Sequence, residues 1–323
     1  MLRKLGCLGV IAVLIIGAAA FWAANQWGGA GPGKANVTVE VPAGATMRSA
    51  AEAMEKAGAI ESADTFLWMA RIFGDDAPVQ AGEYRVPAGI SQADILKMLQ
   101  GGRTLQRFVM IPEGMPSILV HERLAAAPQL GGKTAVPEEG SILPDSYSYN
   151  RGESRQAVLD RMQAAMKKYL AQAWAKRKPG IAVSTPEQAL ILASIVEKET
   201  GKAEERRMVA GVYSNRLKRG MPLQADPTVI YPVTKGKPLG RRILRSELQD
   251  KNGYNTYASA GLPIGPIANP GRASIDAVLD PAETNALYFV ADGTGGHIFA
   301  DTLEQHNANV QKWYALRRAR GEM

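Results

Sequence analysis

Cysteine and histidine are scarce in this chain of 323 residues. The single cysteine, Cys7, lies in an apolar N-terminal segment, so no intramolecular disulfide can form. One cysteine and three histidines exclude a cysteine-rich zinc site. His297 and His306 are not at metal-ligand spacing, and no H-E-x-x-H sequence occurs. We therefore expect structural roles for both histidines and no bound metal.

Several motifs of catalysis and cofactor binding are also missing. Without G-x-S-x-G, serine hydrolysis has no support, and without a P-loop or a dinucleotide fingerprint we expect no cofactor. Aromatic residues make up only 7% of the chain, and no nucleic-acid-binding module is recognisable. The net charge of +7 and the pI near 9.4 therefore favour phospholipid headgroups or acidic polymers over nucleic acid as partners.

The N-terminus carries an almost uninterrupted apolar run at residues 5–24, close to the roughly 20 residues that span a bilayer. Arg3 and Lys4 precede it, which places residues 1–4 in the cytoplasm and the body of the chain outside. Ala18–Ala20 could instead form the cleavage site of a signal peptide. We favour an uncleaved anchor because the apolar character continues through Ala24, and either alternative predicts export.

Beyond the anchor the sequence predicts a linker at 25–35, a small α+β module at 36–103 and a larger α+β domain at 104–323. The linker is rich in glycine (GGAGPGK at 28–34). The module reads as strands at 36–41 and 82–86 and helices at 46–56, 63–72 and 91–99. The larger domain includes a strand at 106–111 and helices at 116–127, 155–177, 185–201 and 203–219, the last with charges that we expect to be mostly solvated.

The stretch 185–201, TPEQALILASIVEKETG, is the most informative in the sequence. Thr185 can cap a helix, Pro186 suits its first position and Gln188 completes a capping box. Gly201 supplies a stop signal. The apolar run between these signals is long enough for a buried helix.

Helical geometry directs one carboxylate of this stretch inward. At 100° per residue, Glu199 shares a face with apolar residues of the interior, whereas Glu197 points to nearly the opposite side. Desolvation and the helix C-terminus would both raise the pKa of Glu199, and a carboxyl protonated near neutral pH suits general acid catalysis at an acetal oxygen. The alternative is a structural glutamate paired with Arg206 or Arg207.

Two later segments resemble a carbohydrate-binding surface. Tyr, Asn, Gln and Thr alternate with Gly and Pro in residues 220–231 and 254–271. Flat rings suit sugar faces, amides and hydroxyls suit sugar hydroxyls, and glycine allows close approach of the backbone. Asp226 could instead cap a short helix. The basic segment 235–245 could be a solvated loop or could face an anionic partner.

Many segments resemble the YceG-like (MltG) family of endolytic murein transglycosylases. The matching stretches include ASIVEKET (193–200), NRL (215–217), DPTVIY (226–231), YNTY (254–257), GLP (261–263), NPG (269–271), YFVADG (288–293) and GGH (295–297). The N-terminal segment and AGEY (81–84) fit as well, so the resemblance covers nearly the whole chain.

The resemblance implies an inner-membrane enzyme with a LysM-like module and a periplasmic catalytic domain that acts on nascent peptidoglycan, with peptidoglycan synthases as possible partners. The family's catalytic glutamate matches Glu199. Positions expected around the cleft are Asp145, Gln224, Asp226, Tyr231, Tyr254 and Asn255. Glu199–Thr200 also resembles the Glu–Ser pair of other lytic transglycosylases.

The implied reaction cleaves the β-1,4 bond between N-acetylmuramic acid and N-acetylglucosamine without water and leaves a 1,6-anhydro end. Glu199 would act first as acid and then as base, so a second carboxylate is not required. Two alternatives remain open: a muramidase-type hydrolase with Asp226 as second carboxylate, and a non-catalytic glycan-binding scaffold of the cell-wall machinery.

Overall fold

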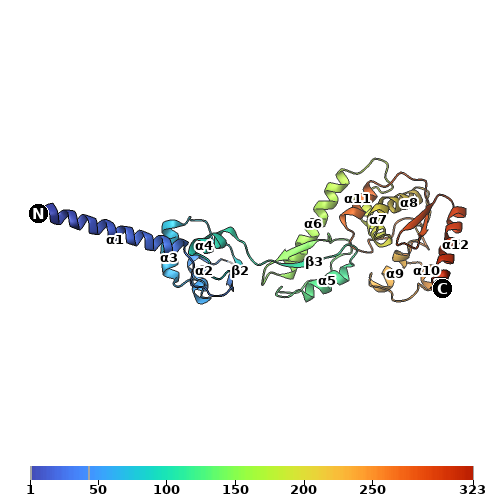
Figure 1. Ribbon diagram of the computed structural model, residues 1–323. Coiled ribbons are helices and arrows are strands. Elements are labelled where there is room, and N and C mark those ends of the chain that lie inside the picture. Colours follow the sequence, from blue (N-terminus) through green and yellow to red (C-terminus); the bar gives the residue numbers. More distant parts are fainter. Residues whose placement is uncertain (1, 43, 323) are drawn as a thin grey trace. The chain divides into compact units, whose positions relative to one another are not determined.

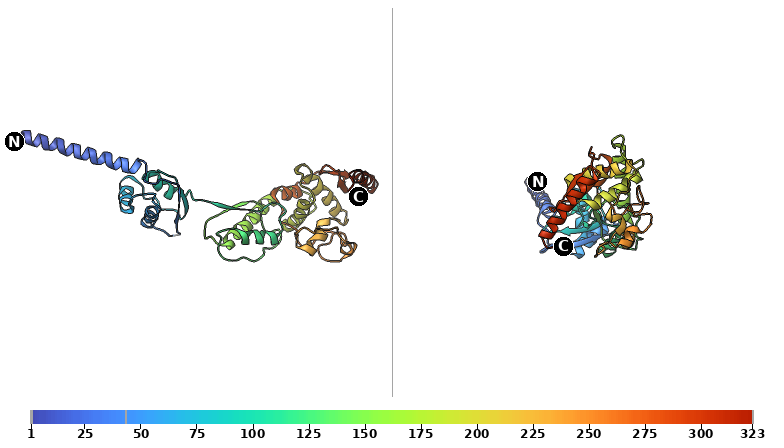
Figure 2. Two further views of the ribbon diagram at one scale, coloured as in Figure 1. Left: turned by 60° about the horizontal axis from the view of Figure 1, so that its bottom comes forward. Right: turned by 90° about the vertical axis from the view of Figure 1, so that its right-hand side faces the viewer.

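The computed structural model describes residues 2–42 and 44–322, and for residues 2–10 and 12 only the backbone. The chain is α+β and divides into two compact units, shown in Figures 1 and 2. The first comprises the residues up to 107 together with 149–151, and the second comprises 108–148 and the residues from 152 onward. The chain thus passes between units at 107/108, four residues beyond the expected boundary.

The first unit begins with helix α1 (Leu2–Gly28), which contains the expected anchor at 5–24. The side chains of residues 5–10 and 12 within that anchor lie outside the described residues. In the part of the chain that is described, no helix meets the length and hydropathy of a membrane span. The C-terminal end of α1 packs on the unit, because the Trp27 ring lies 6.3 Å from that of Phe66 and 6.1 Å from that of Phe73.

A two-stranded antiparallel sheet and three helices form the rest of the first unit. Strand β1 (Val37–Val41) pairs with β2 (Gly82–Val86), with Val39 opposite Tyr84. Val39 and Val41 of β1 and Tyr84 and Val86 of β2 are buried, as a sheet with one face on the core requires, and Glu83 of β2 is buried as well. The helices are α2 (Met47–Lys56), α3 (Ala63–Phe73) and α4 (Gln92–Gly101), capped by Thr46, Ser62 and Ser91, and all lie where the sequence predicted them.

The second unit opens with strands β3 (Arg107–Met110) and β4 (Ser146–Tyr149), which form a two-stranded sheet, and helix α5 (Ser117–Ala126) between them. Its other elements are α6 (Arg155–Ala175), α7 (Pro186–Glu199), η1 (Ala203–Glu205), α8 (Arg206–Lys218), α9 (Asp226–Thr234), α10 (Arg245–Gln249), α11 (Arg272–Leu279), β5 (Tyr288–Ala291), β6 (His297–Ala300) and α12 (Leu303–Ala319). The sequence analysis did not predict β4, α10, α11 or α12. Residues 292–296 join β5 and β6 as an antiparallel hairpin against which α12 packs (Figure 2, red).

Helix α7 is the centre of the second unit and contacts α6, α8, α9 and α11 (Figure 1). Leu192, Ile195 and Val196 are fully buried, and each such burial contributes about 1.5–3 kcal/mol. Thr185 caps the helix by accepting from the backbone N–H of Gln188, as predicted. The capping box is not closed as expected, because the Gln188 side chain accepts from the backbone of Ser184 instead. The helix ends with Thr200 as its C-cap, one residue before the predicted glycine.

Candidate active site

A cavity of about 430 Å³ lies at the C-terminal end of α7. Five segments of the second unit supply its walls: α7, α8, the turn into α9, the loop after α10 and the β5–β6 hairpin with α12. The residues that line it are Glu199, Tyr213, Arg216, Leu223, Gln224, Asp226, Tyr257, Phe289, Val290, Ala291, His297 and His306. Tyrosine and phenylalanine rings thus lie beside charged and amide groups, as a sugar-sized site requires.

Glu199, the last residue of α7, is partly buried and faces this cavity. Burial is the main cause that raises the pKa of its carboxyl to about 7. The negative charge of Asp226 also raises this pKa, whereas a hydrogen bond from Tyr213 and the positive charge of Arg216 lower it. A carboxyl with a pKa near 7 is present both as acid and as base at neutral pH. Glu199 thus faces the cavity with a raised pKa, and its catalytic role stays a prediction.

The two arginines that the sequence offered as structural partners of Glu199 each pair with another carboxylate. Arg206 lies 3.7 Å from a carboxylate oxygen of Glu113, and Arg207 lies 3.0 Å from one of Asp280.

Helix α8 supplies two residues that the sequence analysis missed, Tyr213 and Arg216. They stand three residues apart and so share one face of the helix. The Tyr213 hydroxyl bonds to Glu199, and burial raises the pKa of that hydroxyl well above its usual value. We expected the charges of residues 203–219 to be mostly solvated, which is wrong for Arg216, because it is only 8% exposed.

Arg216 is buried because acceptors surround its guanidinium. Nε donates to the carbonyl of Leu287 at 2.7 Å, and Nη1 donates to the carbonyl of Leu223 at 2.9 Å and to Oε1 of Gln224 at 3.2 Å. The group also lies 5.1 Å from the centre of the Tyr288 ring. A cation held in this way is a fixed charge beside Glu199.

Two of the expected cleft residues, Gln224 and Asp226, line the same cavity and are exposed to it. Gln224 has a φ of 54°, a left-handed conformation that side chains rarely adopt, and its side-chain oxygen meets Arg216. Asp226 accepts a hydrogen bond of 2.6 Å from the hydroxyl of Tyr257. Asp226 is the first residue of α9 and does not cap it, because the N-cap position is occupied by Ala225.

The family follows from the sequence over most of its length, because residues 39–312 match the YceG-like family. The chain belongs to the YceG-like family. It is 28% identical to an endolytic murein transglycosylase of Bacillus subtilis, over 87% of this chain and 85% of that protein. It is 30% identical to one of Streptococcus pneumoniae D39 over 86% of this chain, which spans 58% of that protein's length.

A solved structure shows the same fold. A crystal structure of a yceG-like protein from Listeria monocytogenes superposes with a TM-score of 0.54 at 28% identity, over 85% of this chain and 99% of that chain. The α+β architecture is therefore that of the YceG-like family.

Four other expected cleft residues of this YceG-like chain do not line the cavity that holds Glu199. The Asn255 side chain is 1% exposed and holds the end of α10, donating to the carbonyls of residues 247, 248 and 250. Asp145 accepts a 2.8 Å hydrogen bond from Arg272. The rings of Tyr231 and Tyr254 pack 4.8 Å apart, and Tyr231 lines a separate, mainly apolar cavity of about 460 Å³ with Lys198 of α7.

Glu197 lies on the other side of α7, as predicted, and serves the packing of α11. Its Oε2 accepts from the backbone N–H of Gly271 at 2.9 Å and from the hydroxyl of Ser274 at 2.7 Å. It thus satisfies donors at the N-terminus of α11. The two carboxylates of one helix turn therefore have different environments.

His297 and His306 both line the cavity. The His306 ring stacks on Tyr288 at 5.2 Å, and burial and the charge of Arg216 lower its pKa. Among the described residues, no group of three or more His, Cys, Asp or Glu side chains could hold a metal ion.

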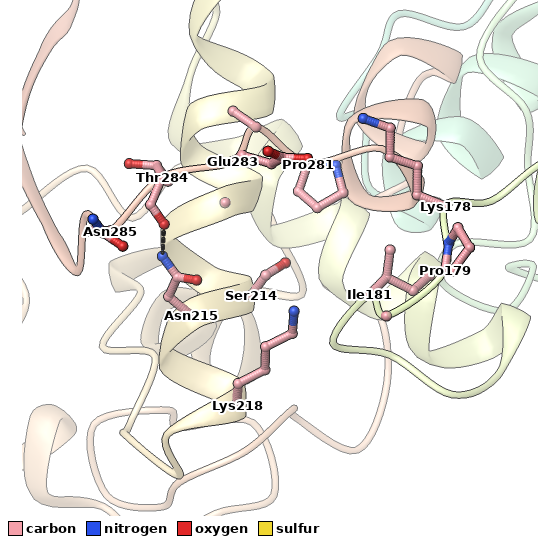
Figure 3. Close-up of a pocket in the computed structure, with 13 residues that line it drawn as sticks. Lys178, Pro179, Ile181, Ser214, Asn215, Lys218, Pro281, Glu283, Thr284 and Asn285 are labelled. Carbon is pink, nitrogen blue, oxygen red and sulfur yellow. Dashed lines mark hydrogen bonds between the residues drawn. The ribbon is translucent and has the colours of Figure 1, made fainter.

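A larger cavity, of about 560 Å³, lies on a different face of α8 (Figure 3). Ser214, Asn215 and Lys218 line it from the helix, and Lys178 and Glu283 from neighbouring loops. Its charged side chains are exposed, and Lys178 is paired with Asp280 at 2.6 Å. The side-chain amide of Asn215 donates to the carbonyl of Thr284, so it fastens a loop to the helix.

Proposed function

We propose that this chain cleaves the β-1,4 bond between N-acetylmuramic acid and N-acetylglucosamine in nascent peptidoglycan strands and leaves 1,6-anhydro ends. The activity class, lytic transglycosylation of peptidoglycan, is that of the relatives that match the chain over most of its length. One observation mainly supports the proposed chemistry: Glu199 faces a polar cavity, and the pKa of its carboxyl is about 7.

In the proposed reaction Glu199 first donates its proton to the glycosidic oxygen while the bond from that oxygen to C1 of the muramoyl residue breaks. The resulting carboxylate then takes the proton of the C6 hydroxyl, whose oxygen forms a bond to C1. The carboxyl is thereby regenerated protonated, and no water is consumed. Tyr213 holds the carboxyl in place, which favours both transfers.

The rim of the cavity supplies binding groups of the right kind. Gln224, Asp226 and Tyr257 offer amide, carboxylate and hydroxyl groups for sugar hydroxyls, and the Tyr257 and Phe289 rings offer flat surfaces. We retain Asp145, Tyr231, Tyr254 and Asn255 as proposed contributors to substrate binding. Of these, Asn255 would act through loop geometry, since both ends of its amide are already bonded.

A muramidase-type hydrolase is the second candidate, because Asp226 lies in the same cavity as Glu199. The two reactions give products of different mass. Digestion of uncrosslinked glycan strands by the purified chain should yield fragments that are lighter by one water than hydrolysis products. Reducing ends in their place would establish the hydrolase and refute the transglycosylase.

We further propose that α1 anchors the chain in the inner membrane, with the N-terminus in the cytoplasm and the second unit in the periplasm. The run of apolar residues after Arg3 and Lys4 supports this. In this arrangement the first unit is a LysM-like module near the membrane, and peptidoglycan synthases are candidate partners. Protease accessibility in spheroplasts tests it: the second unit should be digested from outside while the N-terminus is protected.

A further inference from the structure

His297 occupies a position in the cavity that the proposed chemistry does not use. It is the first residue of β6 and lines the cavity together with Glu199. Its ring packs at a near-perpendicular angle against Phe289, with 5.1 Å between ring centres. These contacts fix the plane of the imidazole but leave the roles of its two nitrogens to their polar partners.

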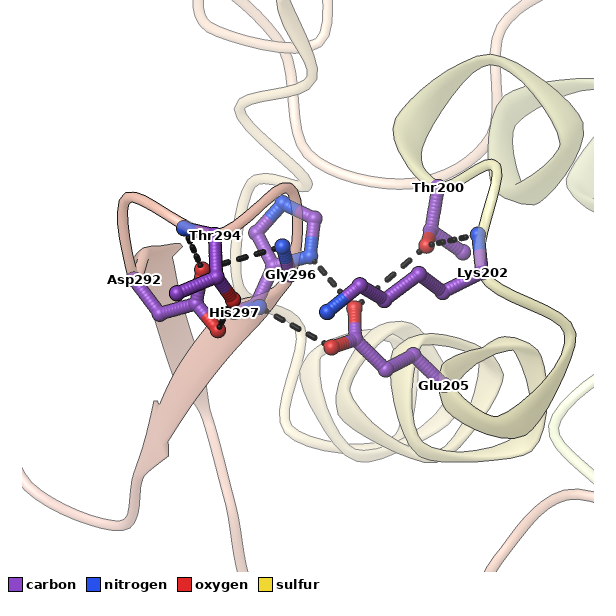
Figure 4. Close-up of polar contacts among 7 residues, drawn as sticks. All are labelled: Thr200, Lys202, Glu205, Asp292, Thr294, Gly296 and His297. Carbon is purple, nitrogen blue, oxygen red and sulfur yellow. Dashed lines mark hydrogen bonds and ion pairs between the residues drawn. The ribbon is translucent and has the colours of Figure 1, made fainter.

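Glu205 of η1 holds one of these nitrogens (Figure 4). Its Oε2 lies 2.8 Å from Nδ1 of His297, and its Oε1 accepts from the backbone N–H of the same residue at 3.0 Å. The hydroxyl of Thr200, the residue after Glu199, lies 3.4 Å from Glu205 and accepts from the backbone N–H of Lys202. The network therefore joins the end of α7 to the β5–β6 hairpin.

The charge state of Glu205 decides which tautomer the imidazole adopts. Burial would raise the pKa of the carboxyl, but the hydrogen bonds from the His297 side chain and backbone outweigh it, so the pKa is lowered. A carboxylate only accepts hydrogen bonds, so Nδ1 must carry the proton. In the neutral ring Nε2 is then an acceptor.

Nε2 is an open acceptor of this site. Within the described part of the chain it has no hydrogen-bond partner, and it is not among the side-chain atoms that are shielded from solvent. It stands beside Gln224 and Asp226, which also line the cavity, so it adds an acceptor to the binding groups named above. Sugars carry hydroxyl and acetamido N–H donors, for which an open acceptor is the complement.

We propose that His297 is a substrate-contacting residue whose Nε2 accepts a hydrogen bond from an acetamido N–H of the glycan, and that Glu205 is the positioning residue that fixes the required tautomer. This assignment rests on the proposed glycan substrate and adds a binding group to it. An amide N–H can only donate, so the contact requires the tautomer in which Nδ1 carries the proton and Nε2 keeps its lone pair.

Replacing Glu199 by Gln prevents cleavage, so that glycan binding alone is measured.

The test uses the full-length Glu199→Gln chain in detergent micelles and measures its Kd for uncrosslinked peptidoglycan glycan strands at one pH near neutrality. Adding His297→Phe keeps a flat ring but removes the acceptor, and should weaken binding about fivefold, the worth of one neutral hydrogen bond of about 1 kcal/mol. His121→Phe is the matched control, since that histidine lies on α5 and contacts Thr134, and it should leave the Kd unchanged.

Glu205→Gln supplies a second variant that leaves the imidazole in place. Its amide can donate to Nδ1, which turns Nε2 into a donor, so binding should again weaken about fivefold. Unchanged binding in both variants would overturn the role of His297 alone. If the Glu199→Gln chain binds no glycan, the proposed substrate itself is wrong.

Discussion

The two cavities that share α8 differ more in the state of their polar groups than in size. The larger, about 560 Å³, is lined by exposed charges such as Lys218 and Glu283. The smaller, about 430 Å³, holds a carboxyl with a pKa of about 7 beside a buried guanidinium with four hydrogen bonds. Desolvated and fixed charges, rather than volume, are what catalysis requires. The smaller cavity is therefore the active-site candidate.

The largest expected effect comes from removing the acid. Glu199→Gln should lower the cleavage rate on the order of 10³-fold, because Gln cannot donate a proton to the glycosidic oxygen. The measurement is release of soluble fragments from uncrosslinked glycan, and circular dichroism shows that the fold is retained.

Glu197→Gln is the matched control on the same helix. It keeps an acceptor for Gly271 and Ser274, so we expect cleavage within about twofold of the original and a loss of about 1 kcal/mol in stability. Comparable losses of cleavage in both variants would place the effect in the helix rather than in the acid.

The pH dependence of cleavage should come next in size. The acid form of Glu199 is needed first, so activity should fall about tenfold for each pH unit above about 7. An activity that rises steadily from pH 7 to 9 would contradict the assignment of Glu199 as acid.

The free energy of unfolding should also depend on pH through the ionisation of Glu199. Because the pKa of Glu199 is higher in the folded chain than in the unfolded one, its favourable contribution is complete below the unfolded pKa and is lost as the pH rises through about 7. Glu199→Gln should therefore stabilise the chain more at pH 8 than at pH 4, by about 1–3 kcal/mol. Urea unfolding at the two pH values measures this difference.

Tyr213→Phe should shift the pH profile rather than abolish cleavage. The hydroxyl favours the ionised form of Glu199. Its removal should therefore shift the alkaline limb of the pH–activity profile to higher pH by about one unit, equivalent to about 1.4 kcal/mol. An unmoved limb would mean that the hydroxyl does not act on Glu199.

The smallest effect is expected in the larger cavity. Lys218→Ala removes an exposed ammonium that is remote from the carboxyl chemistry, so cleavage should stay within about twofold. A tenfold loss of cleavage would show that the larger cavity also takes part in catalysis.

The sequence predicted what depends on local periodicity and capping. Glu199 faces inward because it shares a helix face with apolar residues, and Thr185 begins that helix as expected. Tyr213, Arg216 and His297 were not recognised as site residues, because their convergence depends on how α8 and the β5–β6 hairpin pack. Arg216 resembled a solvated charge because its acceptors lie outside its own helix: the carbonyl of Leu223 in the loop that follows and that of Leu287, 71 residues away.

Loop residues were the hardest to assign. The sequence does not distinguish an exposed side-chain amide that binds a sugar from a buried one that bonds to nearby backbone carbonyls. Asn255 is of the second kind. Gln224, in a neighbouring loop, does line the cavity. Local sequence could not separate them, since the difference is set by the end of α10, a short helix that the sequence analysis did not predict.

The left-handed backbone of Gln224 carries an evolutionary consequence. Glycine adopts a φ of 54° without steric cost, so Gln224→Gly would relieve up to about 1 kcal/mol of strain while removing a partner of Arg216. A hydrogen bond to a buried guanidinium is worth about 1.5–3 kcal/mol, which exceeds the strain relieved. Selection for heat tolerance and selection for turnover should therefore both retain the amide, and glycine recovered there after directed evolution would show that the strain costs more than the hydrogen bond contributes.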